Sequence, residues 1–488
     1  APPASLSNGV AAAIQGLEYT ANMAGLFISA AHKSSGKTTL SIGICAALHA
    51  QGVQVQPFKK GPDYIDPLWL GAASGRPCHN LDFNTMHTAE IRHTVAHYAA
   101  HADLRFVEAN KGLFDGVAID GSDSNAALAK LLELPVVLVI DTRGMTRGIA
   151  PLLLGYQQFD PEVHIAGVIL NRTGGARHAA KLRTAVETYT DLPVLGAVRN
   201  DPALEIEERH LGLMPSNESQ AAAQQIEQIR TQVAEQVDLG MLQQLAASAA
   251  PLPKITPLSA AADMTTPDVR IAICQDAAFG FYYPGDLEAL QQAGAELVAV
   301  NTLQDAGLPE AIDGLFIGGG FPETQMQALA ANHGLRQAIR GAIEDGLPTY
   351  AECGGLMYLS RSLRWNGEIV GMVGVIPGDV VMYERPQGRG YVQVQETAAM
   401  PWPGGVPEAV IRAHEFHYSA LENLTERGQF AYRMLRGTGI DGQHDGWLYK
   451  NLLASYTHMR HTEQFPWAQR FVAFVRAKRQ ERNNRLWL

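Results

Sequence analysis

Cysteine is scarce in this chain. Only Cys45, Cys78, Cys274 and Cys353 occur among 488 residues. Their spacing contains no CxxC pair and matches no zinc-binding pattern. So few cysteines in so long a chain exclude a disulfide framework and favour a reducing compartment, so we expect a cytoplasmic protein.

Long apolar runs and a surplus of positive charge are also missing. No stretch of about 20 apolar residues is free of charged or turn-forming residues, so we expect no membrane span and no membrane partner. The 38 Lys and Arg residues are outnumbered by 49 Asp and Glu residues, which gives a net charge of −11. We therefore expect no nucleic-acid partner, because surfaces that bind nucleic acids are basic.

The length predicts two or three domains. Residues 1–22 lack the basic start and compact apolar core of a secretory signal, and we expect a disordered extension there. Residues 23–215 alternate apolar, β-branched runs with helical segments. The apolar runs are 25–31, 104–110, 135–142, 163–171 and 192–198. This alternation predicts a parallel sheet covered by helices, hence an α/β domain.

A second α/β unit is predicted after a change in composition. Residues 216–268 begin with an Ala- and Gln-rich helical segment and end in a polar stretch with four prolines, "PLPKITPLSAAADMTTPD", which is typical of a linker. Strand–helix alternation resumes over 269–465, and its later strands are expected to be antiparallel. Residues 466–488 are predicted to form a C-terminal helix.

The segment "SAAHKSSGKTTL" lies between a predicted strand and a predicted helix. Gly-Lys-Thr at the start of a helix is typical of a phosphate-binding loop, in which backbone N–H groups and the helix N-terminus bind phosphate oxygens. The predicted ATP-binding residues are Ser34, Ser35, Gly36, Lys37, Thr38 and Thr39. We expect Lys37 to reach the β- and γ-phosphates and Thr38 to bind Mg²⁺, although Ala31 replaces the usual first glycine.

Two carboxylates follow predicted strands of the same domain. Glu108 comes after "RFV" and Asp141 comes after "VVLVI". Acidic residues at strand ends beside a phosphate-binding loop are candidates for metal binding, so we expect Thr38, Glu108 and Asp141 to hold Mg²⁺. Each carboxylate taken alone is also compatible with a solvated strand end.

"TYAECGGLMYLS" places Cys353 between a predicted strand and a predicted helix. Such a turn exposes the side chain at a helix N-terminus, which favours the nucleophilic thiolate. Gly319 and Gly320 of "FIGGGFPE", together with Gly354, are expected to stabilise an oxyanion through their N–H groups. The alternative is a small buried cysteine that happens to precede two glycines.

Several motifs together resemble the cobyrinate a,c-diamide synthases, the ATP- and glutamine-dependent amidases of corrinoid synthesis. They span residues 24–461 and include "KKGPDYIDP", "GRPCHNLD", "GLFDG", "GVILNRTGGARH", "GLFIGGGFPE", "YAECGGLMYL", "HEFHYS" and "ASYTH". Two segments depart from the family pattern. "EANKGLFDG" stands where "EGVMGLYDG" is usual, and Arg460 replaces a common histidine.

The resemblance implies a fold and a set of roles. It implies a dethiobiotin-synthetase-like domain for ATP and Mg²⁺ and a class I glutamine amidotransferase-like domain in which Cys353 is the nucleophile and His458 its base. Glutamine, ATP and a corrinoid are the implied ligands. The oligomeric state stays open, with a homodimer as one candidate. The implied substrate-binding residues are Lys59, Lys60, Asp63, Tyr64, Asp66 and Arg76.

Arg460 also occupies the position at which triad-type amidotransferases carry a glutamate, two residues after the histidine. A dyad or a different acid must then serve, and the sequence does not identify it. Two alternative functions stay open. One is amidation of a related tetrapyrrole, hydrogenobyrinate or nickel-sirohydrochlorin; the other is a regulatory P-loop ATPase with an inactive amidotransferase domain.

Overall fold

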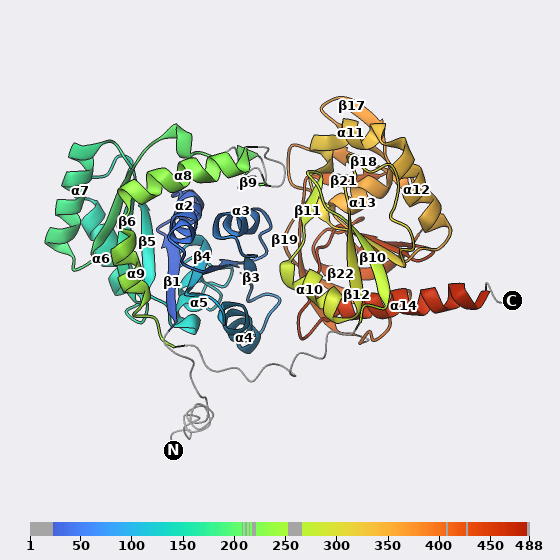
Figure 1. Cartoon of the computed structure of the whole chain (residues 1–488), viewed down its shortest axis with the longest axis horizontal. Coiled ribbons are helices and arrows are strands. Elements are labelled where there is room, and N and C mark those ends of the chain that lie inside the picture. Colours follow the sequence, from blue (N-terminus) through green and yellow to red (C-terminus); the bar gives the residue numbers. More distant parts are fainter. Residues whose placement is uncertain are drawn as a thin grey trace, which may run out of the picture. The chain divides into compact units, whose positions relative to one another are not determined.

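A computed structural model describes residues 23–206, 208–209, 212–213, 215–216, 221–251, 266–406, 408–425 and 428–485. The chain forms two compact units (Figure 1). The first comprises residues 1–83, 87–214 and 221–261, and the second comprises 84–86, 215–220 and 262–488. The expected extension 1–22 and residues 252–265 of the expected linker lie outside the described residues.

The N-terminal unit is built on a seven-stranded sheet with the order β3-β2-β4-β1-β5-β6-β7. All its ladders are parallel. The strands are β1 (Ala24–Ala30), β2 (Val55–Lys60), β3 (His79–Leu81), β4 (Leu104–Gly112), β5 (Val136–Asp141), β6 (Ile165–Thr173) and β7 (Val194–Arg199). The strand order reverses at β1, and the carboxyl ends of β1 and its neighbours are where such sheets bind ligands.

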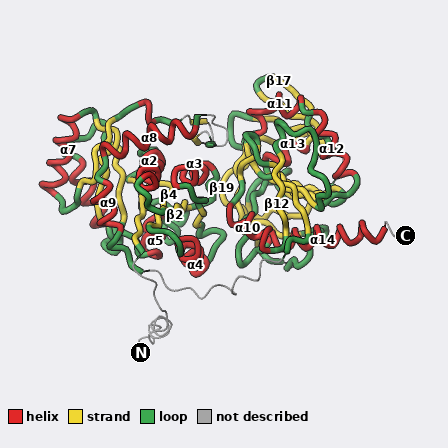
Figure 2. The backbone as a smooth tube through the Cα atoms, viewed as in Figure 1, coloured by secondary structure: helices red, strands yellow, loops and turns green. Residues whose placement is uncertain are grey.

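Helices cover both faces of this sheet (Figure 2). They are α2 (Lys37–Ala50), α3 (Ile65–Ser74), α4 (Thr88–Ala99), α5 (Asn125–Leu132), α6 (Ile149–Phe159), α7 (Ala176–Tyr189), α8 (Ala222–Gln236) and α9 (Leu239–Ala246), with the 3-10 turn η1 (Pro202–Leu204) and the short pair β8 (Glu208–Arg209) and β9 (Gly212–Leu213). The predicted Ala- and Gln-rich helical segment is α8 and α9. α8 packs directly on α2, because a Cβ on Gly43 would lie 2.4 Å from Val233 Cγ2.

The C-terminal unit has a nine-stranded sheet with the order β12-β10-β13-β15-β24-β23-β22-β19-β20. Its first five strands are parallel: β12 (Ala295–Val300), β10 (Val269–Cys274), β13 (Gly314–Ile317), β15 (Thr349–Glu352) and β24 (Leu452–Ser455). The other four are antiparallel, as predicted for the later strands: β23 (His444–Tyr449), β22 (Gln429–Arg436), β19 (Gly388–Glu396) and β20 (Val410–His417).

Smaller elements complete this unit. A four-stranded sheet contains β17 (Glu368–Gly371), β16 (Ser360–Trp365), β18 (Ile376–Met382) and β21 (Ser419–Glu422), and a short pair contains β11 (Phe279–Phe281) and β14 (Gly319–Gly320). The helices are α10 (Pro284–Gln292), η2 (Pro322–Gln325), α11 (Met326–Ala331), α12 (His333–Glu344), α13 (Gly354–Leu359) and α14 (Trp467–Arg485). Among the described residues, no helix is long and apolar enough to cross a membrane. The predicted fold class, two α/β domains with a parallel N-terminal sheet, is confirmed.

Candidate active sites

The phosphate loop joins β1 to α2 and contains two residues with positive φ. Ser34 has φ 64° and Gly36 has φ 81°. A side chain at Gly36 would collide with Asn171, whose Nδ2 would lie 2.2 Å from the added Cβ. Asn171 Nδ2 instead donates to the Ser35 carbonyl at 2.8 Å, and Arg172 Nη1 donates to the Ser34 carbonyl at 2.7 Å. Two residues from the end of β6 thus hold the loop in shape.

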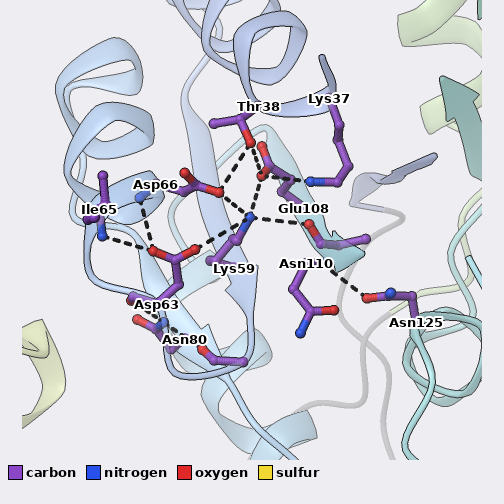
Figure 3. A network of polar contacts seen from close by, with 12 residues as sticks. Lys37, Thr38, Lys59, Asp63, Ile65, Asp66, Asn80, Glu108, Asn110 and Asn125 are labelled. Carbon is purple, nitrogen blue, oxygen red and sulfur yellow. Dashed lines mark hydrogen bonds and ion pairs between the residues drawn. The ribbon is translucent and has the colours of Figure 1, made fainter. Parts of the chain in front are cut away.

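Glu108 on β4 is the centre of a buried polar network beside this loop (Figure 3). Its Oε1 lies 3.3 Å from Lys37 Nζ, 2.5 Å from Lys59 Nζ and 3.0 Å from Thr38 Oγ1. Asp66 Oδ2 contacts two of the same groups, at 2.5 Å from Lys59 Nζ and 3.1 Å from Thr38 Oγ1. Three separate segments therefore bring two ammonium groups, one hydroxyl and two carboxylates together.

The charges in this network stabilise one another. Burial alone would raise the pKa of Glu108, but Lys37 and Lys59 outweigh burial and bring it to about 2. Burial alone would lower the pKa of Lys59, but Asp66 and Glu108 outweigh it and hold that pKa above its ordinary value. For Lys37 burial prevails over Glu108 and lowers the pKa. The carboxylate is thus ionised and available to cations at neutral pH.

The donor set suits a hard divalent cation. Thr38 Oγ1 lies within 3.1 Å of an oxygen of each carboxylate, Asp66 and Glu108, and hydroxyl and carboxylate oxygens are the ligands Mg²⁺ prefers. No cluster of three or more His, Cys, Asp or Glu residues able to hold a metal occurs in the described part of the chain. An ion here would therefore need further oxygen ligands, which nucleotide phosphates supply in such sites.

The predicted substrate loop, residues 57–82, has more regular structure than its composition indicates. It contains the end of β2, the helix α3 and the strand β3. The Asp63 side chain caps the N-terminus of α3, since its Oδ1 accepts from Ile65 N at 2.9 Å and from Asp66 N at 3.1 Å. Asn80 Nδ2 ties the loop down by donating to the carbonyls of Gly61 and Asp63, at 2.8 and 2.7 Å. Lys60 is thus the last residue of β2, and Asp63 and Tyr64 follow its carboxyl end.

One predicted substrate-binding residue, Arg76, has other partners. Arg76 donates to Gln56 Oε1 at 3.0 Å and to the carbonyls of Tyr98 and His101. Gln56 lies near the start of β2, at the opposite end from Lys59, so the expectation that Arg76 contacts substrate is not supported by its position. Thr39, by contrast, follows Thr38 in the first turn of α2 as expected.

Asp141 lies at the end of β5 and is bound by two guanidinium groups. Arg143 Nη2 is 2.7 Å and Arg172 Nη1 is 2.9 Å from its Oδ2. Burial raises the pKa of Asp141, but the hydrogen bonds from both arginines outweigh burial and bring it to about 2. The Thr38 hydroxyl contacts Asp66 and Glu108, whereas Asp141 contacts Arg143 and Arg172, so the geometry favours Asp66 over Asp141 as the second carboxylate beside Thr38.

The second site lies at the carboxyl ends of three adjacent parallel strands, β13, β15 and β24. β13 leads to the glycine turn, β15 leads to Cys353, and β24 leads to His458. Cys353 N donates to the Ser455 carbonyl at 2.7 Å, which joins the second and third of these segments. A Cβ on Gly319 would lie 2.6 Å from His458 Cε1, which joins the first and third.

Cys353 has the backbone of a strained turn, with φ 45° and ψ −96°. The residue is 6% exposed. The predicted effect of the helix N-terminus is present, because the Gly354 N–H lowers the pKa of the thiol, but burial outweighs it. Burial, reinforced by Glu323 and Glu352, raises the pKa of the thiol, and α13 has only six residues, so its dipole is small. The thiol must therefore pass its proton to a base when it reacts.

The glycine turn approaches Cys353 closely. A Cβ on Gly354 would lie 3.0 Å from Gly320 N, so only a glycine leaves this N–H accessible. Tyr282 supports the turn, because Gly318 N donates to its hydroxyl at 2.9 Å. The predicted oxyanion residues Gly319, Gly320 and Gly354 are therefore neighbours in space.

His458 is 3% exposed and packed between two side chains. His414 stacks on its ring with centroids 4.9 Å apart, and Glu352 Oε2 lies 3.8 Å from its Nδ1. Burial lowers the pKa of His458 well below its ordinary value, so the imidazole is neutral and can accept a proton. Asp445 fixes the chain just before it by accepting from Tyr456 N at 3.0 Å and Thr457 N at 2.8 Å.

Sequence reasoning missed the supporting residues of both sites. Asn171 and Arg172 follow the apolar run of β6, and polar residues at that position were a usable signal beside a phosphate loop. Glu352 stands directly before Cys353 in the sequence, yet nothing in the pattern shows that its side chain turns toward His458.

Comparison with known proteins covers nearly the whole chain. Residues 27–213 match the CobQ/CobB/MinD/ParA nucleotide binding domain, and residues 270–465 match the CobB/CobQ-like glutamine amidotransferase domain. The chain is 46% identical to a cobyrinate a,c-diamide synthase of Magnetococcus marinus, covering 93% of this chain and 97% of that protein. It is 39% identical to the enzyme of the same name from Methanosarcina acetivorans, covering 89% and 92%, and 40% identical to that of Archaeoglobus fulgidus, covering 90% and 94%.

Proposed function

Because the chain belongs to the cobyrinate a,c-diamide synthase family, we propose that it converts the a and c carboxylate side chains of cobyrinate to amides. The enzyme is a carbon–nitrogen ligase that uses glutamine as its nitrogen donor, and its nucleotide-binding domain serves ATP. The observation that carries the proposal is that each compact unit contains a set of neighbouring polar residues suited to one half-reaction.

The N-terminal unit activates the carboxylate. A substrate carboxylate oxygen attacks the γ-phosphorus of ATP, the bond to the bridging oxygen breaks, and ADP leaves. Ammonia then attacks the acyl phosphate at carbon and the bond to the phosphate oxygen breaks, which gives the amide and inorganic phosphate that carries the proton lost by nitrogen. Activation is needed because a free carboxylate would have to expel oxide. Lys37 is placed in the phosphate loop to stabilise charge on the transferring phosphoryl group.

Thr38, Asp66 and Glu108 are the residues we assign to Mg²⁺, because their oxygens converge beside the loop. When bound there with ATP, the ion would neutralise phosphate charge. Lys59 bridges the two carboxylates and balances part of their charge.

The corrinoid site is assigned to the loop after β2. Lys60 ends that strand, and Asp63 and Tyr64 follow it. Asp63 lies next to the Glu108 network, since its Oδ2 is 3.9 Å from Lys59 Nζ (Figure 3). The substrate carries several carboxylates, which suits an ammonium group such as Lys60. Asn110 adjoins this loop, since a Cβ on Gly61 would lie 3.0 Å from its Nδ2, so this departure from the family pattern faces the proposed site.

The C-terminal unit releases ammonia. Cys353 sulfur attacks the side-chain carboxamide carbon of glutamine while His458 takes the thiol proton. His458 then gives that proton to the leaving ammonia, and water hydrolyses the glutamyl thioester to glutamate. The N–H groups of Gly320 and Gly354 are placed to stabilise the oxyanion formed on the way.

The test combines product analysis with two variants. The purified protein is incubated with ATP, either glutamine or ammonium chloride, and cobyrinate, hydrogenobyrinate or nickel-sirohydrochlorin, and the products are identified by mass spectrometry. Cys353→Ser should lose amidation with glutamine and keep amidation with ammonium. Lys37→Ala should lose amidation with both and keep glutamine hydrolysis.

Cys274→Ser is the matched control, because Cys274 is a buried cysteine within β10. It should keep both activities. Equal loss of both amidations in folded Cys353→Ser would contradict the two-site proposal. Diamide formation from a tetrapyrrole other than cobyrinate, with no product from cobyrinate, would contradict the assigned substrate.

A further inference from the structure

Glu352 is a buried carboxylate at the end of β15, directly before Cys353. Its side chain is 3% exposed. One oxygen, Oε1, accepts from Tyr350 Oη at 2.5 Å and from Met459 N at 2.8 Å. The other oxygen, Oε2, lies 3.8 Å from His458 Nδ1. Two donors from separate segments therefore fix the carboxylate with one oxygen toward the histidine.

The position two residues after His458 holds a cation instead of an acid. Arg460 places its guanidinium carbon 4.9 Å from the centre of the Tyr283 ring. A histidine that serves as a general base needs a partner on its second nitrogen, which sets the tautomer and stabilises the imidazolium. Glu352 is the carboxylate that the structure places beside that nitrogen.

We infer that Glu352 is the positioning residue for His458 during glutamine hydrolysis, an inference that rests on the proposed function of Cys353. His458 Nδ1–H faces the Glu352 carboxylate, and Nε2 takes the Cys353 proton. The same proton passes from Nε2 to the leaving ammonia, so Glu352 ends the cycle with the charge it had at the start. The present 3.8 Å separation shortens to a hydrogen bond as the imidazolium forms, since such contacts tighten when substrate is bound.

The environment of Glu352 predicts a specific pH dependence. Burial raises the pKa of Glu352 to about 8, with Asp286 adding to the rise and the donors from Tyr350 and Met459 opposing it. The ionised carboxylate stabilises the imidazolium of His458 by its charge and the neutral acid does not, so the rate should rise with pH through this region. The titratable groups that interact with Glu352 are Tyr282, Asp286, Tyr350, Cys353, Tyr432 and His458.

The decisive variant is Glu352→Gln, compared with the parent enzyme and Cys353→Ala. The glutaminase kcat of Glu352→Gln should fall by about 100-fold or more with little change in KM, because the amide cannot stabilise the imidazolium. Its rate should also lose the rise with pH near 8. Amidation with ammonium chloride should stay at the parent rate. Iodoacetamide should modify Cys353 more slowly at neutral pH than in the parent.

Two further variants complete the experiment. Tyr350→Phe removes one donor to the Glu352 carboxylate, and its glutaminase kcat should fall by about 10-fold. This variant tests the role of Glu352 independently, should Glu352→Gln fail to fold. Glu368→Gln, an exposed glutamate on β17, is the control and should match the parent.

The outcomes separate the two proposals. Glutaminase activity of Glu352→Gln or Tyr350→Phe within twofold of the parent, with an unchanged pH profile, would overturn the role of Glu352 while leaving Cys353 as nucleophile. Substantial glutaminase activity in Cys353→Ala would overturn the proposed function itself, and the role of Glu352 with it.

Discussion

Arg172 ties Asp141 to the phosphate loop with a single nitrogen. Its Nη1 lies 2.9 Å from Asp141 Oδ2 and 2.7 Å from the Ser34 carbonyl. Asp141, which the sequence predicts as a metal ligand, thus contacts the phosphate loop through Arg172. The loop residue that Arg172 binds, Ser34, is one with positive φ. The order of the loop depends on this contact.

Arg172→Met should therefore weaken ATP binding. A hydrogen bond that involves a charged group contributes about 1.5–3 kcal/mol, so we expect KM for ATP to rise by roughly 10-fold or more. Glutaminase activity without ATP should be unchanged. Arg177→Met, at an exposed position of α7, is the control. Steady-state kinetics with ammonium chloride give the measurement, and a KM equal to that of the parent would show that the loop holds its shape without Arg172.

Asp63→Asn should separate two roles of one residue. The amide oxygen can still accept from Ile65 N and Asp66 N, so the start of α3 and the melting temperature should be kept. The lost charge lies 3.9 Å from Lys59 and beside the proposed corrinoid site, so amidation should slow or stop after one amide. Glutaminase activity should stay near normal.

Asp63→Ala is the companion variant, because it also removes the acceptor. It should cost about 1 kcal/mol of stability, the usual effect of losing a helix-start acceptor. Diamide formation at the parent rate by Asp63→Asn, with an unchanged melting temperature, would remove Asp63 from the substrate site.

Cys353 should be a position at which glycine is more stable than alanine. A non-glycine residue at φ 45° and ψ −96° costs about 1–3 kcal/mol, and glycine avoids most of that cost. Both Cys353→Gly and Cys353→Ala lack the sulfur, so the comparison isolates the backbone. Urea unfolding should place Cys353→Gly about 1 kcal/mol or more above Cys353→Ala. Equal stabilities would mean that the backbone relaxes once the cysteine is removed.

His414 should make the protein sensitive to acid. Burial lowers its pKa to about 3, whereas an unfolded histidine titrates near 6.5. Between these values the unfolded chain binds a proton that the folded chain does not, so stability is lost as the pH falls below about 6.5. One such group costs about 2 kcal/mol between pH 6.5 and 4.5.

His414→Gln removes this titration and should lose less stability over the same pH range. The measurement is the urea midpoint at pH 6.5 and at pH 4.5 for both proteins. His458 and His461, whose pKa values burial also lowers, remain in both proteins and contribute to the background slope. The same acid loss in the variant and the parent would assign the sensitivity to other groups.

The local parts of both sites could be predicted from the sequence. Lys37 and Thr38 follow a strand and begin a helix, and Glu108 lies on the neighbouring strand, where it pairs with Ile28 of the first, so a strand–loop–helix pattern brings them together. The contact between Asp66 and Thr38 could not be predicted. The position of Asp66 depends on α3, and the Gly, Pro and Asp content of that segment indicates a loop instead of a helix. Arg76 illustrates the reverse. Its chemistry suits a carboxylate, but the turn after α3 carries it back to the start of β2.

The pairing of Glu108 with two ammonium groups has a consequence for the order of ligand binding. A divalent cation that binds without nucleotide is repelled by the ammonium groups of Lys37 and Lys59, which already contact the Glu108 carboxylate. A polyphosphate gives Lys37 a new anionic partner and removes one of the two ammonium groups from the carboxylate oxygen. Free metal and free nucleotide should each bind weakly, while the two together bind as one cooperative unit. This cooperativity arises because the contacts of Lys37 and Lys59 with Glu108 oppose binding of the metal alone.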